Sequence, residues 1–341
     1  AAVGLSDALI AEARFFRAFH YFLLVQTYGG VPLDLGAGDL KFNTSAVRTS
    51  VRNTVPQVYT IGVFPDLVAA VNDLPVSSRL TGTVTKNVAR LYLAKAYLTY
   101  GWWLQNPNNI PTYPEAPRTD PDGRDAAWYF QQAYNVAVEG IDNPGDYKLL
   151  DYFYDVHVGS NDRHAEMMLY ADHTEASEQY NGGSLTYSNP NAGENAAIWM
   201  VTSNYTRMNL GGLAPVQRAA TQDLGRPWTR MAPTINVFVE TFAEKNLDSR
   251  YDGTFTTSYR ANWNLAGNST PSVAGANGLP ITPGDAVLTY LDDYNPAVVY
   301  GNGAGVGGGV LPGRADYVIN LNEINRTNYP GLWKMGTYRT D

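Results

Sequence analysis

The sequence predicts a mainly α-helical protein with a helical scaffold in its first part and a loop-rich second part that carries a few short strands. Within residues 1–140, several segments space their apolar residues by three and four, as amphipathic helices do. From about residue 141, stretches rich in Asn, Gly, Thr, Ser and Pro separate short apolar runs. We therefore expect a scaffold over 1–140 and a loop-rich region over 141–341.

The first expected helix runs from about Leu9 to Thr27 and is unusually rich in aromatic residues. Ser6 or Asp7 can cap its start, and the Gly29–Gly30 pair can end it. The apolar spacing of three and four is kept at Leu9, Ala13, Phe16, Phe19 or His20, Leu23 and Leu24. We interpret the rings of this segment as packing residues of the scaffold, namely Phe15, Phe16, Phe19, Tyr21 and Phe22.

Three further helices are expected in the scaffold. One covers about 57–74 and should kink or break at Pro65, because proline lacks the backbone N–H that a helix interior needs. The others cover about 85–104 and 124–138. The stretch "ARLYLAKAYLTYG" has the alternation of small and large residues that is typical of tetratricopeptide helices, so the scaffold is predicted to be a tetratricopeptide-like superhelix.

Regular structure is expected to be sparse in the second part. Short strands are predicted at "EMMLYA" (166–171) and "YVINL" (317–321), and a helix at about 234–243. Residues 264–313 are predicted to form loops.

Composition excludes several classes of function. The net charge of −8 and the lack of a dense basic tract argue against nucleic-acid binding. The absence of cysteine excludes disulfides, thiolate zinc sites and a cysteine nucleophile. No apolar run approaches the ~18–20 residues that span a bilayer. The chain starts close to a helix and ends without a tail-like composition, so we expect the N- and C-terminal parts of a longer protein to be missing.

No catalytic motif is present, and we expect the protein not to be an enzyme. The histidines are scattered without metal-ligand spacing, and nucleophile-elbow and phosphate-loop motifs are absent. Two acid pairs, Glu175 with Glu178 and Asp292 with Asp293, are interpreted as solvated rather than catalytic. No cofactor is expected, although Asp285, Asp292 and Asp293 could hold a structural calcium ion through oxygen ligands.

Several motifs, in one order along the chain, resemble the SusD/RagB family, the surface glycan-binding lipoproteins of Bacteroidetes. They include "AEARFFRAFHYFLLVQTYGGVPL", "FPDLVAAVNDLP", "TVTKNVARLYLAKAYLTYG", "RMAPTINVFVETF" and "NYPGLWKM". The resemblance covers nearly the whole chain except residues 264–313. The chain departs from the family pattern by lacking the lipobox cysteine, the upstream segment and the final helical pair.

The resemblance implies a SusD-like fold and a binding function rather than catalysis. It places the protein on the extracellular face of the outer membrane, held by a lipid anchor that is not visible in this chain. There the protein would capture oligosaccharide and act as a lid on a TonB-dependent, SusC-like transporter. Two alternatives remain open: peptide capture in the RagB-like manner, and a structural surface subunit that binds no small ligand.

The candidate ligand-binding residues lie in loops of the second part. Sugars are recognised by aromatic rings that stack on their C–H faces and by polar groups that bond their hydroxyls, and Tyr and Trp present such faces at little entropic cost. The sequence therefore points to Trp199, Asn204, Tyr205, Arg207, Trp228, Trp263, Tyr290 and Tyr294. If Trp199, Trp228 and Trp263 were all buried, the structural-subunit alternative would be favoured.

Overall fold

The computed structural model describes residues 6–36, 51–112, 117–158, 161, 163–170, 201–219, 221–224, 231–301 and 305–335. The chain forms two compact units. The first unit contains Ala1–Leu149 and Ala165–Asp172, and the second contains Leu150–His164 and His173–Asp341. The boundary expected at residue 140 marks the start of loop-like sequence, whereas the structural division falls at Leu149.

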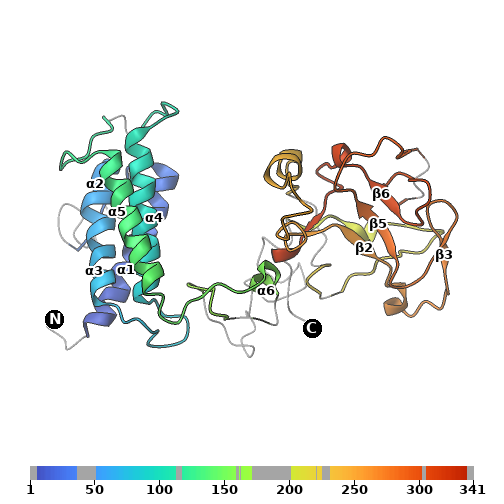
Figure 1. Cartoon of the computed structure of the whole chain (residues 1–341), viewed down its shortest axis with the longest axis horizontal. Coiled ribbons are helices and arrows are strands. Elements are labelled where there is room, and N and C mark those ends of the chain that lie inside the picture. Colours follow the sequence, from blue (N-terminus) through green and yellow to red (C-terminus); the bar gives the residue numbers. More distant parts are fainter. Residues whose placement is uncertain are drawn as a thin grey trace, which may run out of the picture. The chain divides into compact units, whose positions relative to one another are not determined.

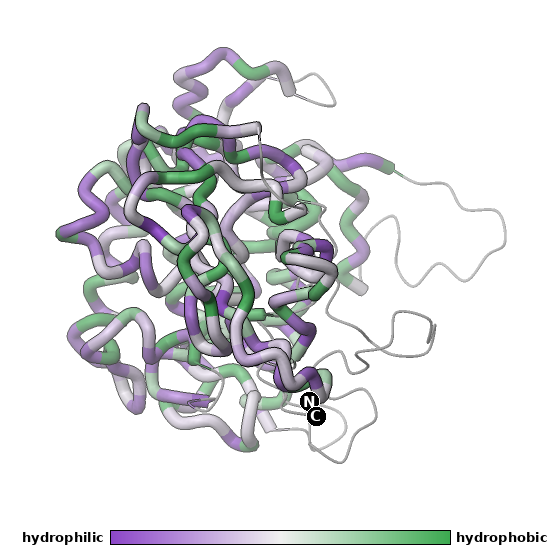
Figure 2. Tube along the Cα trace, turned by 90° about the vertical axis from the view of Figure 1, so that its right-hand side faces the viewer, coloured by the Kyte–Doolittle hydropathy of each residue, from purple (hydrophilic) through white to green (hydrophobic). Residues whose placement is uncertain are grey.

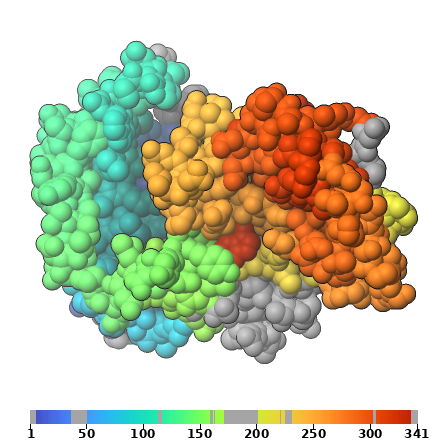
Figure 3. All heavy atoms as spheres, turned by 45° about the vertical axis from the view of Figure 1, so that its right-hand side comes forward, coloured from blue at the N-terminus to red at the C-terminus, as the bar shows by residue number. Residues whose placement is uncertain are grey.

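The first unit is a set of helices that run in alternating directions, as Figure 1 shows. The long helices are α1 (Asp7–Tyr28), α3 (Phe64–Asp73), α4 (Lys86–Gln105) and α5 (Ala126–Asp142), and a short α2 (Val55–Gln57) precedes α3. All four expected helices are thus present, and α5 continues past Gly140 to Asp142. Helices α4 and α5 pack side by side along their length, without a gap in the space-filling view (Figure 3). Within the described residues, no helix is both long enough and apolar enough to cross a bilayer.

Helix boundaries follow the capping residues of the sequence. The Ser6 side chain accepts a hydrogen bond from the Leu9 N–H, and Thr85 and Asp125 cap α4 and α5 in the same way. Helix α1 ends at Gly29, whose φ of 71° lies in the left-handed region that glycine adopts without strain.

Proline at position 65 changes the helix type instead of kinking a continuous helix. Because Pro65 has no N–H, it cannot bond to the carbonyl of Ile61 four residues before it. The backbone widens into a π-helical segment, η1 (Val58–Val63), in which the Phe64 N–H bonds to the Tyr59 carbonyl. Helix α3 then begins at Phe64 with Pro65 in its first turn, a position where the missing donor costs nothing.

Helix α1 carries apolar residues on two faces. The buried face is not the one marked by the apolar residues at spacing three and four in the sequence analysis. The buried residues are Ala11, Phe15, Ala18, Phe22 and Val25. The exposed large residues of the helix include Leu9, Phe16, Leu23 and Leu24. The packing interpretation therefore holds for Phe15 and Phe22, whereas Phe16 is 42% exposed and is corrected to a surface residue.

A buried carboxylate organises the connection between α4 and α5. The Asp120 Oδ2 accepts hydrogen bonds from the Tyr100 hydroxyl at 3.2 Å and the Tyr129 hydroxyl at 2.7 Å. Its Oδ1 accepts from the backbone N–H groups of Asp122 and Arg124. Burial of Asp120 is tolerated because both of its oxygens have donors. It thereby fixes the loop to the two helices.

The second unit has little regular structure, as expected. Its helical turns are α6 (Phe153–His157), η4 (Tyr205–Arg207), η5 (Val237–Thr241), η6 (Trp263–Ala266), η7 (Leu321–Glu323) and η8 (Trp333–Met335). Its strands are β1 (Phe255–Thr256), β2 (Ser258–Arg260), β3 (Val273–Ala274), β4 (Pro280–Ile281), β5 (Ala286–Tyr290), β6 (Tyr317–Ile319) and β7 (Gly331–Leu332). Hydrophobic and hydrophilic stretches alternate over short distances in this unit (Figure 2). The fold class predicted from the sequence is confirmed: a mainly helical protein with few short strands.

The strand expected at 317–321 is present as β6, but the one expected at 166–171 is not seen in residues 166–170. That segment packs on the first unit instead, where the Met168 carbonyl accepts a hydrogen bond from the Tyr147 hydroxyl. The helix expected at 234–243 is shortened to a few turns around η5.

A three-stranded sheet forms the centre of the second unit. Strand β5 lies in the middle, antiparallel to β2 and parallel to β6, with Leu288 opposite Tyr259 and Tyr317. Two two-stranded pairs, β1 with β7 and β3 with β4, complete the regular structure. Large buried side chains gather around this sheet, including Trp263, Tyr259, Tyr329, Phe238 and Ile281. The sheet and its core hold the loops that build the site.

Candidate functional site

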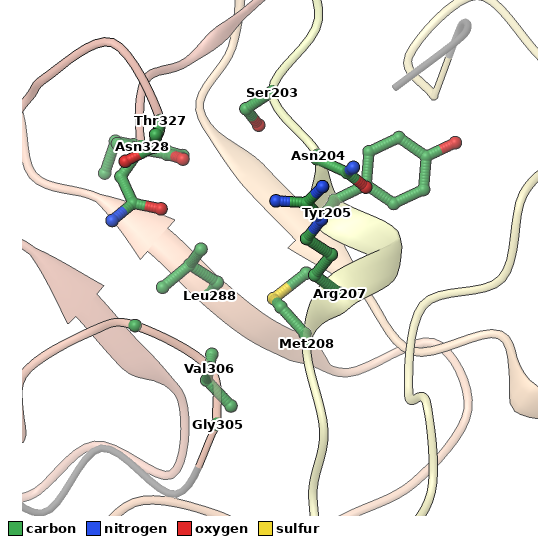
Figure 4. A pocket seen from close by; sticks show the side chains of 12 residues that line it. Ser203, Asn204, Tyr205, Arg207, Met208, Leu288, Gly305, Val306, Thr327 and Asn328 are labelled. Atoms are coloured by element: carbon green, nitrogen blue, oxygen red, sulfur yellow. The ribbon is translucent and has the colours of Figure 1, made fainter. Parts of the chain in front are cut away.

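A small cavity lies beside β5 in the second unit, and Figure 4 shows the side chains that line it. Its volume is about 170 Å³. This is below the ~300 Å³ of pockets that enclose drug-sized molecules, so the cavity can hold one ring or end group of a longer ligand. The lining residues are Ser203, Asn204, Tyr205, Arg207, Met208, Leu288, Tyr290, Gly305, Val306, Gly307, Thr327 and Asn328.

The wall that carries Asn204 and Arg207 is anchored by a buried tyrosine. The Tyr205 ring stacks on Tyr259 with 5.0 Å between ring centres and is only 2% exposed. The Arg207 N–H donates to the Asn204 carbonyl, which closes the η4 turn. With the ring of Tyr205 held in the core, the side chains of Asn204 and Arg207 face the cavity (Figure 4).

Glycines allow the loop at 305–307 to approach this wall. Gly305 and Gly307 have φ values of 72° and 80°, and the Gly305 carbonyl accepts a hydrogen bond from the Asn209 N–H. A Cβ atom at Gly305 would lie 3.1 Å from Asn209, so a side chain there would be both strained and crowded.

The opposite wall is a turn fixed by Asn325. Its Oδ1 accepts hydrogen bonds from the Thr327 hydroxyl and from the N–H groups of Thr327 and Asn328. The Asn328 carbonyl in turn accepts from the Asn325 N–H. This Asx turn orders Asn328 before any ligand arrives, and its side-chain amide points into the cavity (Figure 4).

The floor is apolar because strand residues two apart share one face. Leu288 and Tyr290 lie on the cavity side of β5, while Thr289 between them lies on the other. The Thr289 hydroxyl donates to the Asp316 Oδ2 at 2.7 Å, and Arg314 forms an ion pair with the same carboxylate. These contacts join β5 to β6 behind the cavity.

The Asp316 network makes the stability of this unit depend on pH. Burial alone would raise the pKa of Asp316, but hydrogen bonds from Arg314 and Thr289 outweigh it and hold that pKa below its ordinary value. Its contribution is therefore complete above the ordinary pKa of about 4 and is lost as pH falls through the lower folded-state pKa. We expect Asp316→Asn to destabilise the unit by about 1–2 kcal/mol at neutral pH. In urea titrations, its difference from the wild type should shrink as the pH falls below about 4, and a constant difference would contradict this role.

Among the described residues that line the cavity, Arg207 carries the only ionic group, and none is an aspartate or glutamate. Its side chain is exposed, and its guanidinium points toward the space in front of Asn328 (Figure 4). Within the part of the chain that the structure describes, the guanidinium has no ion pair or hydrogen bond. Burial raises the pKa of both Tyr205 and Tyr290, so these hydroxyls stay neutral near neutral pH.

Four of the expected site residues meet at this cavity: Asn204, Tyr205, Arg207 and Tyr290. Their roles differ from expectation, because the rings of Tyr205 and Tyr290 are each 2% exposed and offer no stacking face. Tyr294 is 56% exposed but does not line the cavity. Trp199 and Trp228 lie outside the described residues.

Trp263 is corrected from a ligand-binding ring to a core residue. It is 0% exposed, and its indole N–H donates to the Thr270 carbonyl at 2.9 Å. A ring with no exposed face and a satisfied polar group can stack on no ligand.

Sequence reasoning missed several residues of the cavity, including Leu288, Met208, Val306, Thr327 and Asn328. Leu288 and Met208 look like ordinary core residues in the sequence. Asn328 follows a short polar run, Asn325 to Thr327, which is a signal for a turn but carries no sign of a ligand.

The acidic residues considered for calcium lie in different settings. Asp285 accepts hydrogen bonds from the backbone and hydroxyl of Thr282, which lower its pKa. Asp292 and Asp293 are exposed. Among the described residues, no group of three or more His, Asp or Glu side chains is arranged to hold a metal ion.

Comparisons with known proteins agree with this architecture. Residues 5–98 match the family model SusD-like_3, described as starch-binding and associating with the outer membrane. Comparison with curated proteins gives no match. Among solved structures, NanU from B. fragilis is 11% identical with a TM-score of 0.51, and the alignment covers 94% of this chain and 54% of that one.

Two other solved structures are similar at lower TM-scores. A SusD superfamily protein from Parabacteroides distasonis is 21% identical with a TM-score of 0.48, covering 76% of this chain and 45% of that one. A protein crystallised with a xylogluco-oligosaccharide is 22% identical with a TM-score of 0.48, covering 74% of this chain and 41% of that one. The chain thus spans about half the length of these proteins, or less.

A helical-repeat scaffold followed by a loop-rich unit with a small open cavity defines the class of this protein: it has the SusD-like fold. The family model confirms, over residues 5–98, the resemblance to the SusD/RagB family inferred from the sequence.

Proposed function

We propose that the protein binds oligosaccharides and that the cavity beside β5 holds one sugar unit of the bound chain. The observation that carries the proposal is the cavity itself, where an apolar floor at Leu288 is surrounded by the polar side chains of Asn204, Arg207 and Asn328. Such a combination suits a sugar ring, which has apolar C–H faces and polar hydroxyls. The family model, whose description names starch binding, supports the same ligand class.

The wider role follows from the family and forms part of the proposal. The protein would be anchored at the extracellular face of the outer membrane and would deliver its ligand, as a lid, to a SusC-like TonB-dependent transporter. Copurification of such a barrel with the tagged protein from detergent-solubilised outer membranes tests this role. Recovery of the protein without any barrel would contradict it.

No reaction is assigned to the protein. Glycoside hydrolysis needs two carboxyl groups about 5–9.5 Å apart across the scissile bond, and the cavity lining, as far as the structure describes it, contains no aspartate or glutamate. We therefore propose a binding protein and not an enzyme.

Asn328→Ala tests whether the cavity is the binding site. The amide is already ordered by the turn at Asn325, so its loss should remove one well-placed hydrogen bond and weaken oligosaccharide binding about fivefold. Asn264→Ala is the matched control, because Asn264 is an exposed asparagine of the same unit outside the cavity. Binding is measured by isothermal titration calorimetry with ligands selected on a glycan array.

Three outcomes separate the alternatives. Oligosaccharide binding that weakens with Asn328→Ala, but not with Asn264→Ala, supports the proposal. Binding of peptides alone would replace it by RagB-like peptide capture. Binding of neither class would favour a structural subunit.

A further inference from the structure

Several side chains at the cavity have hydrogen-bond donors that no protein acceptor among the described residues uses. The Asn204 Oδ1 already accepts a hydrogen bond from the Thr206 hydroxyl at 2.8 Å, and the Gly305 carbonyl accepts one from the Asn209 N–H. The Thr327 hydroxyl donates to Asn325. Within the described residues, the Arg207 guanidinium and the side-chain NH₂ groups of Asn204 and Asn328 have no protein acceptor.

These donors suit two kinds of sugar substituent to different degrees. A neutral hydroxyl both donates and accepts, so a site for hydroxyls offers donors and acceptors together. An ionised carboxylate only accepts, and it suits donors that converge on it, above all a guanidinium. The cavity offers donors on three side chains, of which the Arg207 guanidinium is cationic, and its described lining residues include no carboxylate, so its chemistry suits an ionised carboxylate.

Charge gives a second and independent argument. The whole chain carries a net charge of −8, which on its own would repel an anionic ligand. Two arginines of this unit are paired with acids, Arg250 with Asp248 and Arg314 with Asp316. Arg207 instead lies at a cavity whose described lining residues include no aspartate or glutamate. A positive charge with no counter-ion among the described residues is available to a ligand at the cavity.

From these observations we infer that the cavity recognises an acidic sugar, with the carboxylate of a uronic acid-type residue bound by Arg207 and the amides of Asn204 and Asn328. The inference rests on the proposed oligosaccharide-binding function and names its ligand class. Leu288 and Val306 supply the apolar surface for the ring that carries the carboxylate. The cavity volume of about 170 Å³ limits this recognition to one residue of the glycan.

The test uses acidic oligosaccharides paired with neutral copies of themselves. A glycan array carries galacturonate- and glucuronate-containing oligosaccharides, the same compounds after carboxyl reduction, and unrelated neutral glycans and peptides. The pair with the strongest signal is then titrated calorimetrically with the wild type, Arg207→Ala and Arg14→Ala. Arg14 is an exposed arginine of α1 in the other unit, so its variant removes the same charge without touching the cavity.

We expect the acidic member of the pair to bind at least about tenfold more tightly than its reduced copy, because a charge-assisted bond is lost on reduction. Arg207→Ala should remove this preference, whereas Arg14→Ala should keep it. Affinity for the acidic ligand should also fall from about 0.1 M to about 1 M salt, as the Debye length shrinks from about 10 to about 3 Å.

Failure of this inference can be distinguished from failure of the proposed function. Equal binding of acidic and reduced ligands, or an unchanged preference in Arg207→Ala, would overturn the acidic-sugar inference and leave oligosaccharide binding in place. Binding of carboxylate-ended peptides without any glycan, or of nothing on the array, would overturn both.

Discussion

Trp263→Ala is expected to lower the free energy of unfolding of the second unit by about 3–5 kcal/mol, the range for removing a large aromatic side chain from a core. Trp263 is fully buried, and its indole N–H donates to the Thr270 carbonyl. The substitution would leave a cavity in the core of the unit and a carbonyl without its donor. Both effects act in the same direction.

Amide hydrogen exchange of β5 and β6 measures this loss, because it reports the stability of the second unit separately from the helices. Trp263→Phe should lower the free energy of unfolding much less, since phenylalanine keeps an aromatic ring in the core. Tyr294→Ala, at an exposed ring, should change stability by less than about 0.5 kcal/mol. A stable Trp263→Ala variant that has lost oligosaccharide binding would restore the ligand-contacting role and contradict the core assignment.

Phe15→Ala should destabilise the first unit by about 3–5 kcal/mol, while Phe16→Ala should cost less than about 1 kcal/mol. The two residues are neighbours in the sequence, but Phe15 is 0% exposed and Phe16 is 42% exposed. The Phe15 ring packs edge-to-face on Tyr92 of α4 with 5.5 Å between ring centres. Phe15→Ala leaves a cavity between α1 and α4. Phe16→Ala leaves no such cavity, and alanine has the higher helix propensity.

Urea unfolding followed by far-ultraviolet circular dichroism tests the pair, because the helices of the first unit dominate that signal. The two variants have identical composition, so any difference between them reflects position alone. Equal losses would contradict the assignment of the core to the face that carries Phe15.

The helices could be predicted from the sequence because their signals are local. Ser6, Thr85 and Asp125 are capping residues, and Gly29 is a stop residue, whatever the rest of the chain does. Pro65 likewise predicts a change in the helix. The form of that change, a π-helical segment before the proline, depends on packing.

Which face of α1 becomes the core could not be read from the sequence. Both faces carry apolar residues at helical spacing, so the apolar period alone does not distinguish Phe15 from Phe16. The choice is made by Tyr92 and the other helices that pack on α1, and these contacts join residues far apart in the chain.

The candidate site was predictable only where its residues lie close together in the sequence. Asn204 and Arg207 stood out as polar residues around an aromatic residue in one short loop, and the structure places both at the cavity. Leu288 and Asn328 gave no signal, because each becomes a lining residue only when β5 and the turn after Asn325 are brought beside that loop.

The sequence by itself determined the helical elements and their caps, the sparseness of regular structure in the second part and the resemblance to the SusD/RagB family. Only the tertiary structure decided that the central strand β5 lies in the stretch expected to be loops, which rings are buried, as for Trp263, Tyr205 and Tyr290, and that Arg207 has no counter-ion among the described residues. The physical reason is that caps and apolar periods act within a few residues, whereas burial and counter-ions depend on segments that meet only on folding.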